Sequence, residues 1–411
     1  MKRSSRIRSA RFDWPSAWVE VVTDSCPGTG DTETVAAAVK TLSDQFLDRT
    51  TGTADTSMSM IPYGENPAFL AAYIRYYLLV NTPKLIAIFE DSGIDLQTIS
   101  RVLDIGTGPG TAAIAALIAG YRCGIHSSLD IAAIDHSAAF LRTAGNLIRR
   151  FRSLLDRPGT DSFSRSFPSL PSPLTDRSFM PSSQSTGSPD LILVSNALAE
   201  FDTSLQNRLP DILDGIAVPG SYLVVMEPAR KASARRALHL RNVLCTRGWA
   251  VRYPCPGDYP CPALECPRDW CHHRLTWTAP PPVRTIDRYT GMEKDLLNFS
   301  PLVLIKPKPM DSTPVVGPTD LSLHLGPLRI VSELRSYKGK QEITVCGRFS
   351  TGGQLMICML ENKRLSRYND VFPDLARYDR IRIEGATRRG DRIILSESSR
   401  VIRLENDGGQ E

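Results

Sequence analysis

The sequence predicts an α/β fold of the doubly wound, Rossmann-like kind, preceded by helices and followed by a small β-barrel. A short apolar strand is predicted from residue 101 to the carboxylate of Asp104, three alternating glycines follow it, and an alanine-rich helix comes next. This order is typical of a ligand-binding βα unit, because glycines let the backbone approach a ligand closely. A second apolar strand ends at Asp135, and short alternating strands appear near the C-terminus.

Length and composition set the class of protein. With 411 residues and a hydrophobic fraction of 42%, the chain can form two or three domains with cores of their own. No segment approaches the ~18 apolar residues that a membrane span needs, and no secretory signal opens the chain, so we expect no membrane association. Nine cysteines is an odd number, and without a secretory signal we expect a reducing compartment. Such a compartment favours metal ligation over disulfides.

The N-terminal region divides into a basic arm and helices. The first eleven residues carry five basic side chains and no acidic one, which indicates an arm that touches RNA or is disordered. Mostly helical patterns follow up to residue 100, and prolines at Pro67 and Pro83 are expected to open two of the helices. We expect a helical cap whose aromatic residues lie in its core: Tyr73, Tyr76, Tyr77 and Phe89.

The expected cofactor-binding residues share a position at or just after the C-terminal end of a strand: Asp104, Gly106, Gly108, Gly110, Asp135, Ser195 and Asn196. Gly-x-Gly-x-Gly after an acidic strand end differs from the dinucleotide fingerprint and resembles motif I of the class I S-adenosylmethionine-dependent methyltransferases. Asp135 is expected to bind ribose hydroxyls, and capping of the following helix is the alternative role. No catalytic residue can be assigned from the sequence.

A cysteine-rich run suggests a metal site. Cys255, Cys261, Cys266 and Cys271 are separated by gaps of five, four and four residues, and three of them precede a proline. These gaps fit neither a paired zinc knuckle nor the short ferredoxin run, so an iron–sulfur cluster is the first interpretation and zinc the second. Buried or disulfide-bonded cysteines are the third. His272 and His273 are further candidate ligands, but adjacent side chains rarely both reach one metal.

The C-terminal module is basic. Strands are indicated at residues 342–349, 354–360, 380–385 and 392–396, a spacing that suggests a small barrel of the oligonucleotide-binding kind. Residues 328–404 hold 16 Lys and Arg against 9 Asp and Glu, a net charge of +7, whereas the whole chain carries +5. Concentrated positive charge favours phosphate binding, and four aromatic residues could stack on bases: Tyr337, Phe349, Tyr368 and Tyr378. A solvated barrel with core aromatics is the alternative.

These patterns divide the chain into five segments. A basic arm and helical cap occupy residues 1–99, and a methyltransferase-like domain occupies 100–252 with a disordered Ser- and Pro-rich insertion at 157–189. A cysteine-rich segment with the end of the sheet covers 253–305, a Pro-rich linker covers 306–327, and the basic barrel covers 328–411. The basic run on the helix at 229–244 is interpreted as a solvated face.

Several of these motifs together resemble one family. Motif I, Glu227-Pro228, Tyr253-Pro-Cys-Pro256, Cys261-Pro262 and Asp269-Trp-Cys-His272 resemble the methyltransferase-like assembly factors of the small ribosomal subunit, whose mitochondrial members act on the mitoribosome. The resemblance runs from about residue 60 to about residue 360. It implies a protein that carries an iron–sulfur cluster, most simply a 4Fe-4S cluster, and binds ribosomal RNA (rRNA) of the nascent small subunit. It also implies Cys255, Cys261, Cys271 and Cys346 as ligands, with Cys266 as the alternative fourth ligand.

We therefore expect a small-subunit assembly factor that binds rRNA, an iron–sulfur cluster and S-adenosylmethionine, and that acts as a monomer. The alternatives are an active S-adenosylmethionine-dependent rRNA methyltransferase and a zinc-containing small-molecule methyltransferase. Base-directed methylation often uses an Asn/Asp-Pro-Pro-aromatic element or a cysteine near the donor methyl, and Ser195–Leu198 supplies neither. The expected compartment is the cytoplasm of a prokaryote, with the mitochondrial matrix as the alternative.

Overall fold

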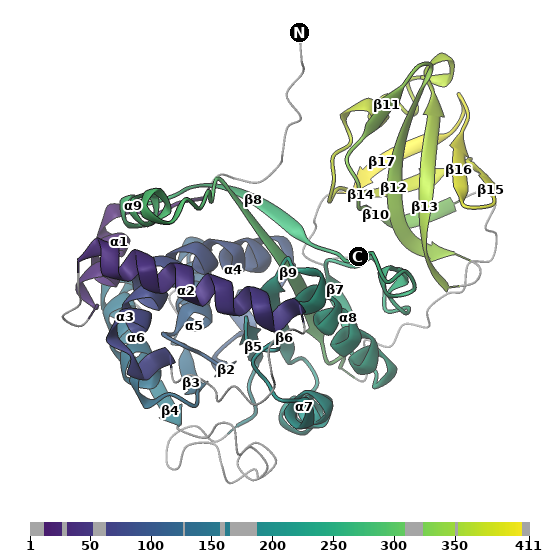
Figure 1. Cartoon of the computed structure of the whole chain (residues 1–411). Helices are drawn as coiled ribbons and strands as arrows, with labels where there is room; N and C mark the ends of the chain where they lie inside the picture. The colour runs from purple at the N-terminus through teal and green to yellow at the C-terminus, as the bar shows by residue number, and fades with distance from the viewer. Residues whose placement is uncertain are drawn as a thin grey trace.

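Two β-sheets organise the chain in the computed structural model (Figure 1), which describes residues 12–26, 31–51, 63–125, 128–156, 161–164, 187–308, 324–349 and 352–404. The expected basic arm at residues 1–11 and most of the expected Pro-rich linker lie outside the described residues. Among the helices that the structure describes, none has both the length and the apolar character to cross a lipid bilayer.

The larger sheet is the doubly wound sheet that the sequence predicts. Its strands run in the order β1-β8-β9-β6-β5-β2-β3-β4, and β7 also pairs with β9. Strands β2 to β6 are mutually parallel, whereas β9 is antiparallel to β6, β7 and β8. The nine strands are β1 (Phe12–Asp13), β2 (Arg101–Ile105), β3 (Asp130–Ile134), β4 (Asp161–Ser164), β5 (Leu191–Ser195), β6 (Tyr222–Pro228), β7 (Ala250–Tyr253), β8 (His273–Thr278) and β9 (Leu296–Ile305). The strand order reverses direction between β2 and β5, which is where such sheets bind ligands.

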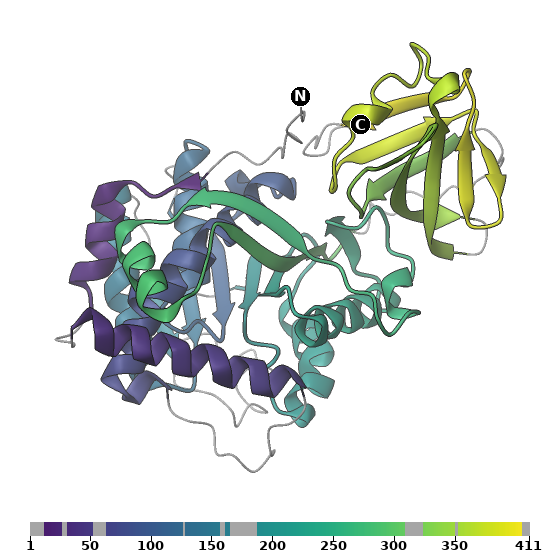
Figure 2. The same ribbon diagram turned by 45° about the horizontal axis from the view of Figure 1, so that its top comes forward.

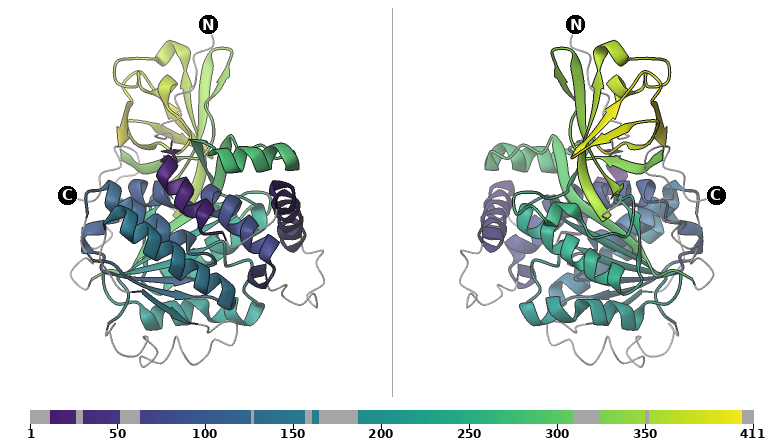
Figure 3. Two further views of the ribbon diagram at one scale, coloured as in Figure 1. Left: turned by 90° about the vertical axis from the view of Figure 1, so that its left-hand side faces the viewer. Right: turned by 90° about the vertical axis from the view of Figure 1, so that its right-hand side faces the viewer.

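Helices cover both faces of this sheet (Figure 3). One apolar core joins one sheet face to α1 (Ser16–Asp24), α2 (Thr32–Thr51), α3 (Pro67–Ala72), η2 (Tyr73–Leu78), α4 (Leu79–Asp91), α5 (Thr111–Arg122), α6 (Ala138–Leu155) and α9 (Pro281–Thr290). A second core joins the other face to α7 (Thr203–Ile216) and α8 (Lys231–Thr246). Val102 belongs to the first core and Leu103 to the second, as expected for alternating side chains of a buried strand. Short 3₁₀ turns occur at Tyr63–Glu65, Leu96–Thr98, Pro262–Leu264, Asn362–Arg364 and Phe372–Asp374.

Pro83 lies inside α4, so the expectation that it opens a helix is wrong. Proline has no N–H, and the carbonyl of Leu79 therefore loses its usual donor within the helix. The indole Nε1 of Trp14 donates to that carbonyl at 3.0 Å, which compensates for the missing bond and fastens the N-terminal segment to α4. Pro67 does open a helix as expected, with the side chain of Asn66 capping α3.

The expected disordered insertion at residues 157–189 is wrong for part of its length. Residues Asp161–Ser164 form β4, which pairs in parallel with β3 at the edge of the sheet. An edge strand is held by its backbone hydrogen bonds, so a polar segment can form one without filling a core. Residues 157–160 and 165–186 of the insertion lie outside the described residues.

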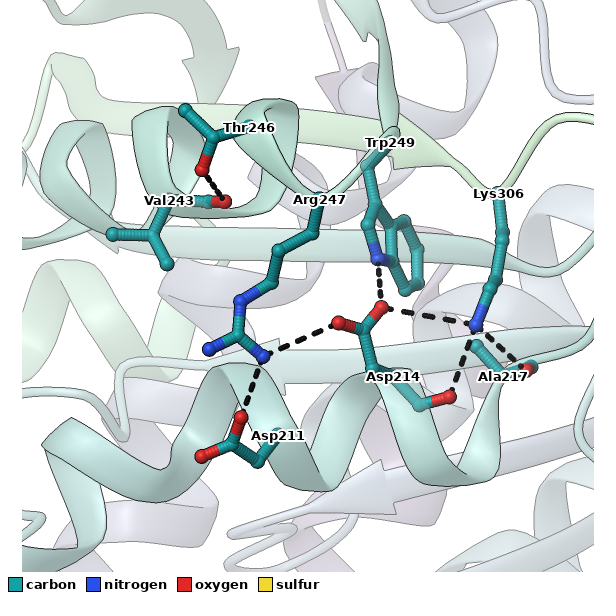
Figure 4. A network of polar contacts seen from close by, with 8 residues as sticks. All are labelled: Asp211, Asp214, Ala217, Val243, Thr246, Arg247, Trp249 and Lys306. Carbon is teal, nitrogen blue, oxygen red and sulfur yellow. Dashed lines mark hydrogen bonds and ion pairs between the residues drawn. The ribbon is translucent and has the colours of Figure 1, made fainter.

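A polar network lies where α7, the end of α8 and the end of β9 meet (Figure 4). The buried indole of Trp249 donates to Asp214 Oδ1 at 2.7 Å, and Lys306 Nζ donates to the Asp214 carbonyl at 3.0 Å. Arg247 Nη1 bridges Asp211 Oδ1 at 2.6 Å and Asp214 Oδ2 at 3.3 Å. The network joins α7, the end of α8 and the end of β9, which fixes α8 against the sheet.

The second sheet wraps around its own apolar core beside the end of β7 (Figure 2). Its strands run in the order β15-β16-β13-β12-β10-β14-β17, with β11 paired to β12. They are β10 (His324–Ile330), β11 (Arg335–Tyr337), β12 (Lys340–Phe349), β13 (Gly352–Glu361), β14 (Arg380–Glu384), β15 (Thr387–Arg389), β16 (Arg392–Leu395) and β17 (Arg400–Leu404). The four strands expected from the sequence are present as β12, β13, β14 and β16.

Candidate functional site

A cavity of about 760 Å³ opens where the strand order of the larger sheet reverses. Its floor comes from the segments that follow β2, β3, β5 and β6, and its roof comes from α2, η2 and α4. A volume of this size suits a small-molecule ligand. Of the seven expected cofactor-binding residues, the cavity lining includes Gly106, Gly108, Asp135, Ser195 and Asn196.

The three glycines of the turn differ in their surroundings and in what their small size allows. A Cβ on Gly106 would lie 2.8 Å from the Cβ of Ala197, so the turn must pass close to the loop after β5. Gly108 has φ +53°, and no heavy atom lies within 4 Å of a Cβ built there. Gly110 is absent from the cavity lining and packs on α6, where its Cβ would lie 3.2 Å from Ala144. Gly110 thus sets helix packing, whereas Gly106 and Gly108 border the ligand space.

Asp135 ties the two expected ligand-binding loops together. Its Oδ2 accepts from Gly108 N at 2.8 Å, and its Oδ1 accepts from Ser137 N at 2.9 Å. The side chain of Ser137, not that of Asp135, caps α6 by accepting from Phe140 N at 3.2 Å. Burial is the largest cause that raises the pKa of Asp135, partly offset by these hydrogen bonds. Asp135 therefore combines a place in the cavity wall with a backbone-holding role.

Asp104 lies under the glycine turn and is absent from the cavity lining. Its Oδ2 accepts from Thr107 Oγ1 at 2.7 Å and from Ala113 N at 3.3 Å, so it fastens the turn to the start of α5. Burial raises the pKa of Asp104 to about 7, and the nearby Asp135 adds to the rise. Asp104 positions the turn from below and does not face the ligand space.

The exit of β5 and the end of β6 complete the cavity floor. Asn196 has φ +54°, and its backbone N donates to Met226 O at 2.7 Å. Glu227 at the end of β6 is fully buried, and its Oε1 accepts from Leu198 N at 3.0 Å. Its Oε2 has no hydrogen-bond partner among the described residues. Sequence reasoning used Glu227 only as a family marker and missed that its carboxyl borders the cavity.

The aromatic residues of η2 do more than fill a core. Tyr76 is fully buried, as expected, and its hydroxyl donates to Asp287 Oδ1 at 2.6 Å. Tyr73 and Tyr77 are only partly buried and line the cavity. All three lie in η2, a π-helical turn, and such turns occur frequently at functional sites.

Four thiols meet at a second, much smaller cavity between the two sheets. Cys255, Cys261 and Cys271 come from the cysteine-rich segment, and Cys346 comes from β12 of the second sheet. Cys266 is absent from this lining. Burial is the largest cause that raises the pKa of the Cys261 thiol to about 12, and burial also raises the pKa of Cys346. Across the described ranges, no group of three or more His, Cys, Asp and Glu side chains is arranged to hold a single metal ion.

Two arginines of α8 hold the cysteine-rich segment. Arg241 is fully buried, lines the thiol cavity, and donates to the carbonyls of Gly257 and Tyr259. Arg235 donates to the carbonyls of Ala263, Leu264, Cys266 and Asp269, all within 2.9–3.0 Å. The interpretation of this basic run as a solvated face is therefore wrong for both residues. The sequence offers no signal for this, because the partners are carbonyls of an irregular segment.

The junction with the second sheet is closely packed. A Cβ on Gly353 would lie 2.1 Å from the Tyr259 ring, so only glycine allows β13 to approach the cysteine-rich segment. His273 stacks on Tyr378 at 4.3 Å, and its Nδ1 lies 2.9 Å from the Tyr253 hydroxyl. Arg329 contacts the other ring nitrogen of His273, so both nitrogens already have partners.

The expected base-stacking residues divide into two pairs. Phe349 is core and Tyr378 is part of the junction, so the expectation is wrong for Phe349. Tyr337 and Tyr368 are 49% and 38% exposed. Lys340 lies over the Tyr337 ring at 5.3 Å, and Arg367 and Arg400 lie over the Tyr368 ring at 4.8 and 6.0 Å. These two aromatic–cation groups remain available to a ligand.

Comparison with known families identifies the chain. The family model described as "Mitochondrial small ribosomal subunit Rsm22" matches residues 94–351, more than half of the sequence. The chain belongs to the Rsm22 family. The matched range includes the glycine turn and all four cysteines of the thiol cavity, but not the part of the larger cavity that is lined by α2, η2 and α4.

Solved structures give weak similarities, and no curated protein matches the chain. The [4+2]-cyclase SpnF has 16% identity and a TM-score of 0.32, over 55% of this chain and 80% of its own. Magnesium protoporphyrin IX methyltransferase from Synechocystis PCC 6803 has 11% identity and a TM-score of 0.31, over 68% and 99%. An O-methyltransferase family protein from Burkholderia thailandensis has 15% identity and a TM-score of 0.30, over 59% of each chain.

The first prediction concerns Glu227 and pH. Burial raises its pKa from 4.5 to about 8, so between these values the folded state binds a proton that the unfolded state has lost. Stability must then fall as pH rises through this window, by up to about 1.4 kcal/mol per pH unit. Glu227→Gln mimics the protonated form and removes this loss. Chemical unfolding at several pH values should show the variant gaining on the wild type between about pH 5 and pH 8.

The control for this prediction is Glu293→Gln, which changes an exposed glutamate in the same domain. A constant difference between Glu227→Gln and the wild type over the whole pH range would show that the Glu227 carboxyl is ionised in the folded protein.

Proposed function

We propose that this Rsm22-family protein is an assembly factor of the small ribosomal subunit that binds rRNA, an iron–sulfur cluster and S-adenosylmethionine. The observation that carries the proposal is that the family match includes the glycine turn that borders the larger cavity, together with four thiols at the junction with a basic module. The family description as mitochondrial favours the mitochondrial matrix over the cytoplasm as the compartment. We also propose that the chain acts as a monomer.

S-adenosylmethionine fits the part of the cavity beside the glycine turn. Gly108 leaves open space where its backbone faces the cavity, and Asp135, Ser195 and Asn196 border the same space. Carboxylate and amide groups at strand ends suit the hydroxyls and amines of a nucleoside cofactor. When bound, the cofactor would supply an activated methyl group, but the proposal does not require its transfer.

The four-thiol set fits an iron–sulfur cluster. Cys255, Cys261, Cys271 and Cys346 would hold it, and Cys266 would not, because only the four line the cavity. Four thiolates are the usual ligand set of an iron–sulfur cluster, and the four cysteines line one cavity. Arg241 and Arg329 line the same cavity and would offset the negative charge of the thiolates. The cluster would supply a covalent link between the two sheets.

The second sheet is proposed to be an oligonucleotide-binding barrel that contacts rRNA. Its net charge of +7 over residues 328–404 favours phosphate, and the Tyr368 group combines an exposed ring with two guanidinium groups. Association with the small ribosomal subunit follows from the family description, which names that particle.

Cysteine substitutions test the cluster. Anaerobically purified protein should be brown and contain iron and acid-labile sulfide in similar amounts. Serine substitution of any cavity cysteine (Cys255, Cys261, Cys271 or Cys346) should remove most of the colour and iron, because each would be a ligand. Cys266→Ser is the matched control and should retain both. Colourless wild-type protein with stoichiometric zinc would contradict the cluster proposal.

Glycine substitutions test the cofactor site. Gly108→Ala would place a methyl group in the open space at the turn and should weaken S-adenosylmethionine binding by about 10-fold or more in calorimetry. Gly124→Ala is the matched control, because Gly124 also has a positive φ, +70°, with open space around it but lies outside the cavity lining. Equal loss of affinity in both variants, or no binding by the wild type, would count against the cofactor proposal.

Charge reversals test the rRNA surface. Arg367→Glu combined with Arg400→Glu should weaken binding to small-subunit rRNA and reduce the slope of log affinity against log salt by about 0.7–0.9 for each phosphate that the variant no longer neutralises. Reversal of Arg284 and Arg288 on α9 changes the net charge equally and should have a smaller effect. Filter binding at several salt concentrations measures both. A wild-type affinity that does not depend on salt would oppose phosphate recognition.

A further inference from the structure

The 760 Å³ cavity extends beyond the glycine turn into a compartment under the cap helices. We call it the cap compartment and define it by Phe46, Tyr73, Tyr77, Lys84, Arg230 and Lys294. The three aromatic rings form one wall: Tyr73 and Tyr77 lie 5.4 Å apart, and Phe46 lies 5.7 Å from Tyr77. Partly buried rings that border open space suit a planar, apolar ligand surface.

Three cations lie beside this wall. Lys84 comes from α4, Arg230 directly precedes α8, and Lys294 precedes β9. Among the described residues none of them forms an ion pair within 4 Å: the Lys84 ammonium donates to Asn81 Oδ1 at 2.8 Å, and the buried Nη1 of Arg230 has no hydrogen-bond partner. Asp287, which attracts Lys294, already accepts a hydrogen bond from the Tyr76 hydroxyl. The compartment thus holds positive charge that is only partly compensated.

The pKa values of the two lysines are lowered, as expected for cations that lie close together in a buried place. Burial, followed by repulsion from Lys294, lowers the pKa of Lys84 to about 7. Burial also lowers the pKa of Lys294, and Arg230 adds to this effect against the opposing attraction of Asp287. A bound anion would relieve this repulsion and favour the protonated state of both lysines.

The cavity charges fall into two separate groups. Lys84, Arg230 and Lys294 interact with one another, with Tyr77 and with Asp287. The acids of the glycine-turn side interact with other partners: Asp135 with His136 and Asp104, and Glu227 with Glu200 and Arg236.

We propose that the cap compartment binds a single nucleotide unit. Its base would lie against Phe46, Tyr73 and Tyr77, and its phosphate would be held by Lys84, Arg230 and Lys294. Aromatic stacking together with cationic phosphate contacts is how proteins bind unstacked nucleotides without reading their sequence. In the proposed function, this unit would be an rRNA nucleotide that enters beside the cofactor, so that assignment rests on the function proposed above.

Calorimetry with the full, cluster-loaded chain tests the proposal, using uridine and adenosine 5′-monophosphates, the matching nucleosides, and inorganic phosphate. Each monophosphate should bind at least about 10-fold more tightly than its nucleoside and than phosphate alone. Lys84→Met and Arg230→Gln should weaken monophosphate binding by about 10- to 100-fold. Tyr73→Leu should weaken binding of the nucleosides as well as of the monophosphates. Lys231→Gln is the matched control, because Lys231 adjoins Arg230 but is exposed and absent from the lining.

The same variants should be titrated with S-adenosylmethionine. If Lys84→Met and Arg230→Gln abolish cofactor binding and no monophosphate binds to the wild type, the cations serve the cofactor carboxylate and the proposal is wrong. Monophosphate binding should also be measured in Gly108→Ala and in the Arg367→Glu, Arg400→Glu double variant. If it persists there, the cap compartment binds nucleotides whether or not the proposed function is correct. Where Lys84→Met fails to fold, Lys294→Gln at a half-buried position gives the same readout.

Discussion

Two arginine side chains of α8 hold the cysteine-rich segment, which joins the larger sheet to the second sheet. The cysteine-rich segment between β7 and β8 has almost no regular secondary structure, so its carbonyls cannot be satisfied by a ladder or a helix. Arg235 and Arg241 supply donors to six of these carbonyls. Without them, the partly buried carbonyls of this irregular segment would lose their donors, and a buried acceptor without a partner costs about 1–3 kcal/mol.

Complete burial of Arg241 costs free energy unless hydrogen bonds replace the hydration that its guanidinium loses. It contacts two loop carbonyls and Asn242 Oδ1, and it borders the four thiols. A positive charge in that position favours thiolate over thiol, whereas burial opposes it. The same side chain therefore shapes the loop and sets the electrostatic environment of the thiol cavity. Arg329, from the second sheet, also lines this cavity.

The sequence predicted those features whose cause is local. The strand that precedes the glycine turn, the turn itself, and four strands of the second sheet depend on short-range apolar patterns and on backbone geometry, and all are present. Features with distant causes were missed. Pro83 is tolerated inside α4 because Trp14, far away in sequence, satisfies Leu79, and β4 forms because β3 offers an edge. Phe349 could not be distinguished from an exposed stacking ring by composition alone, since only the tertiary core buries it.

Helix α8 connects the two candidate sites in one rigid element. Arg230 and Ser233 at its beginning line the larger cavity, whereas Arg235 and Arg241 hold the cysteine-rich segment. Its 16 residues span about 24 Å, and a helix of that length moves largely as a unit. The polar network around Asp214 fixes the far end of this helix against α7 and β9. Any displacement of the cysteine-rich segment must therefore either break the Arg235 and Arg241 hydrogen bonds or shift Arg230 in the cap compartment.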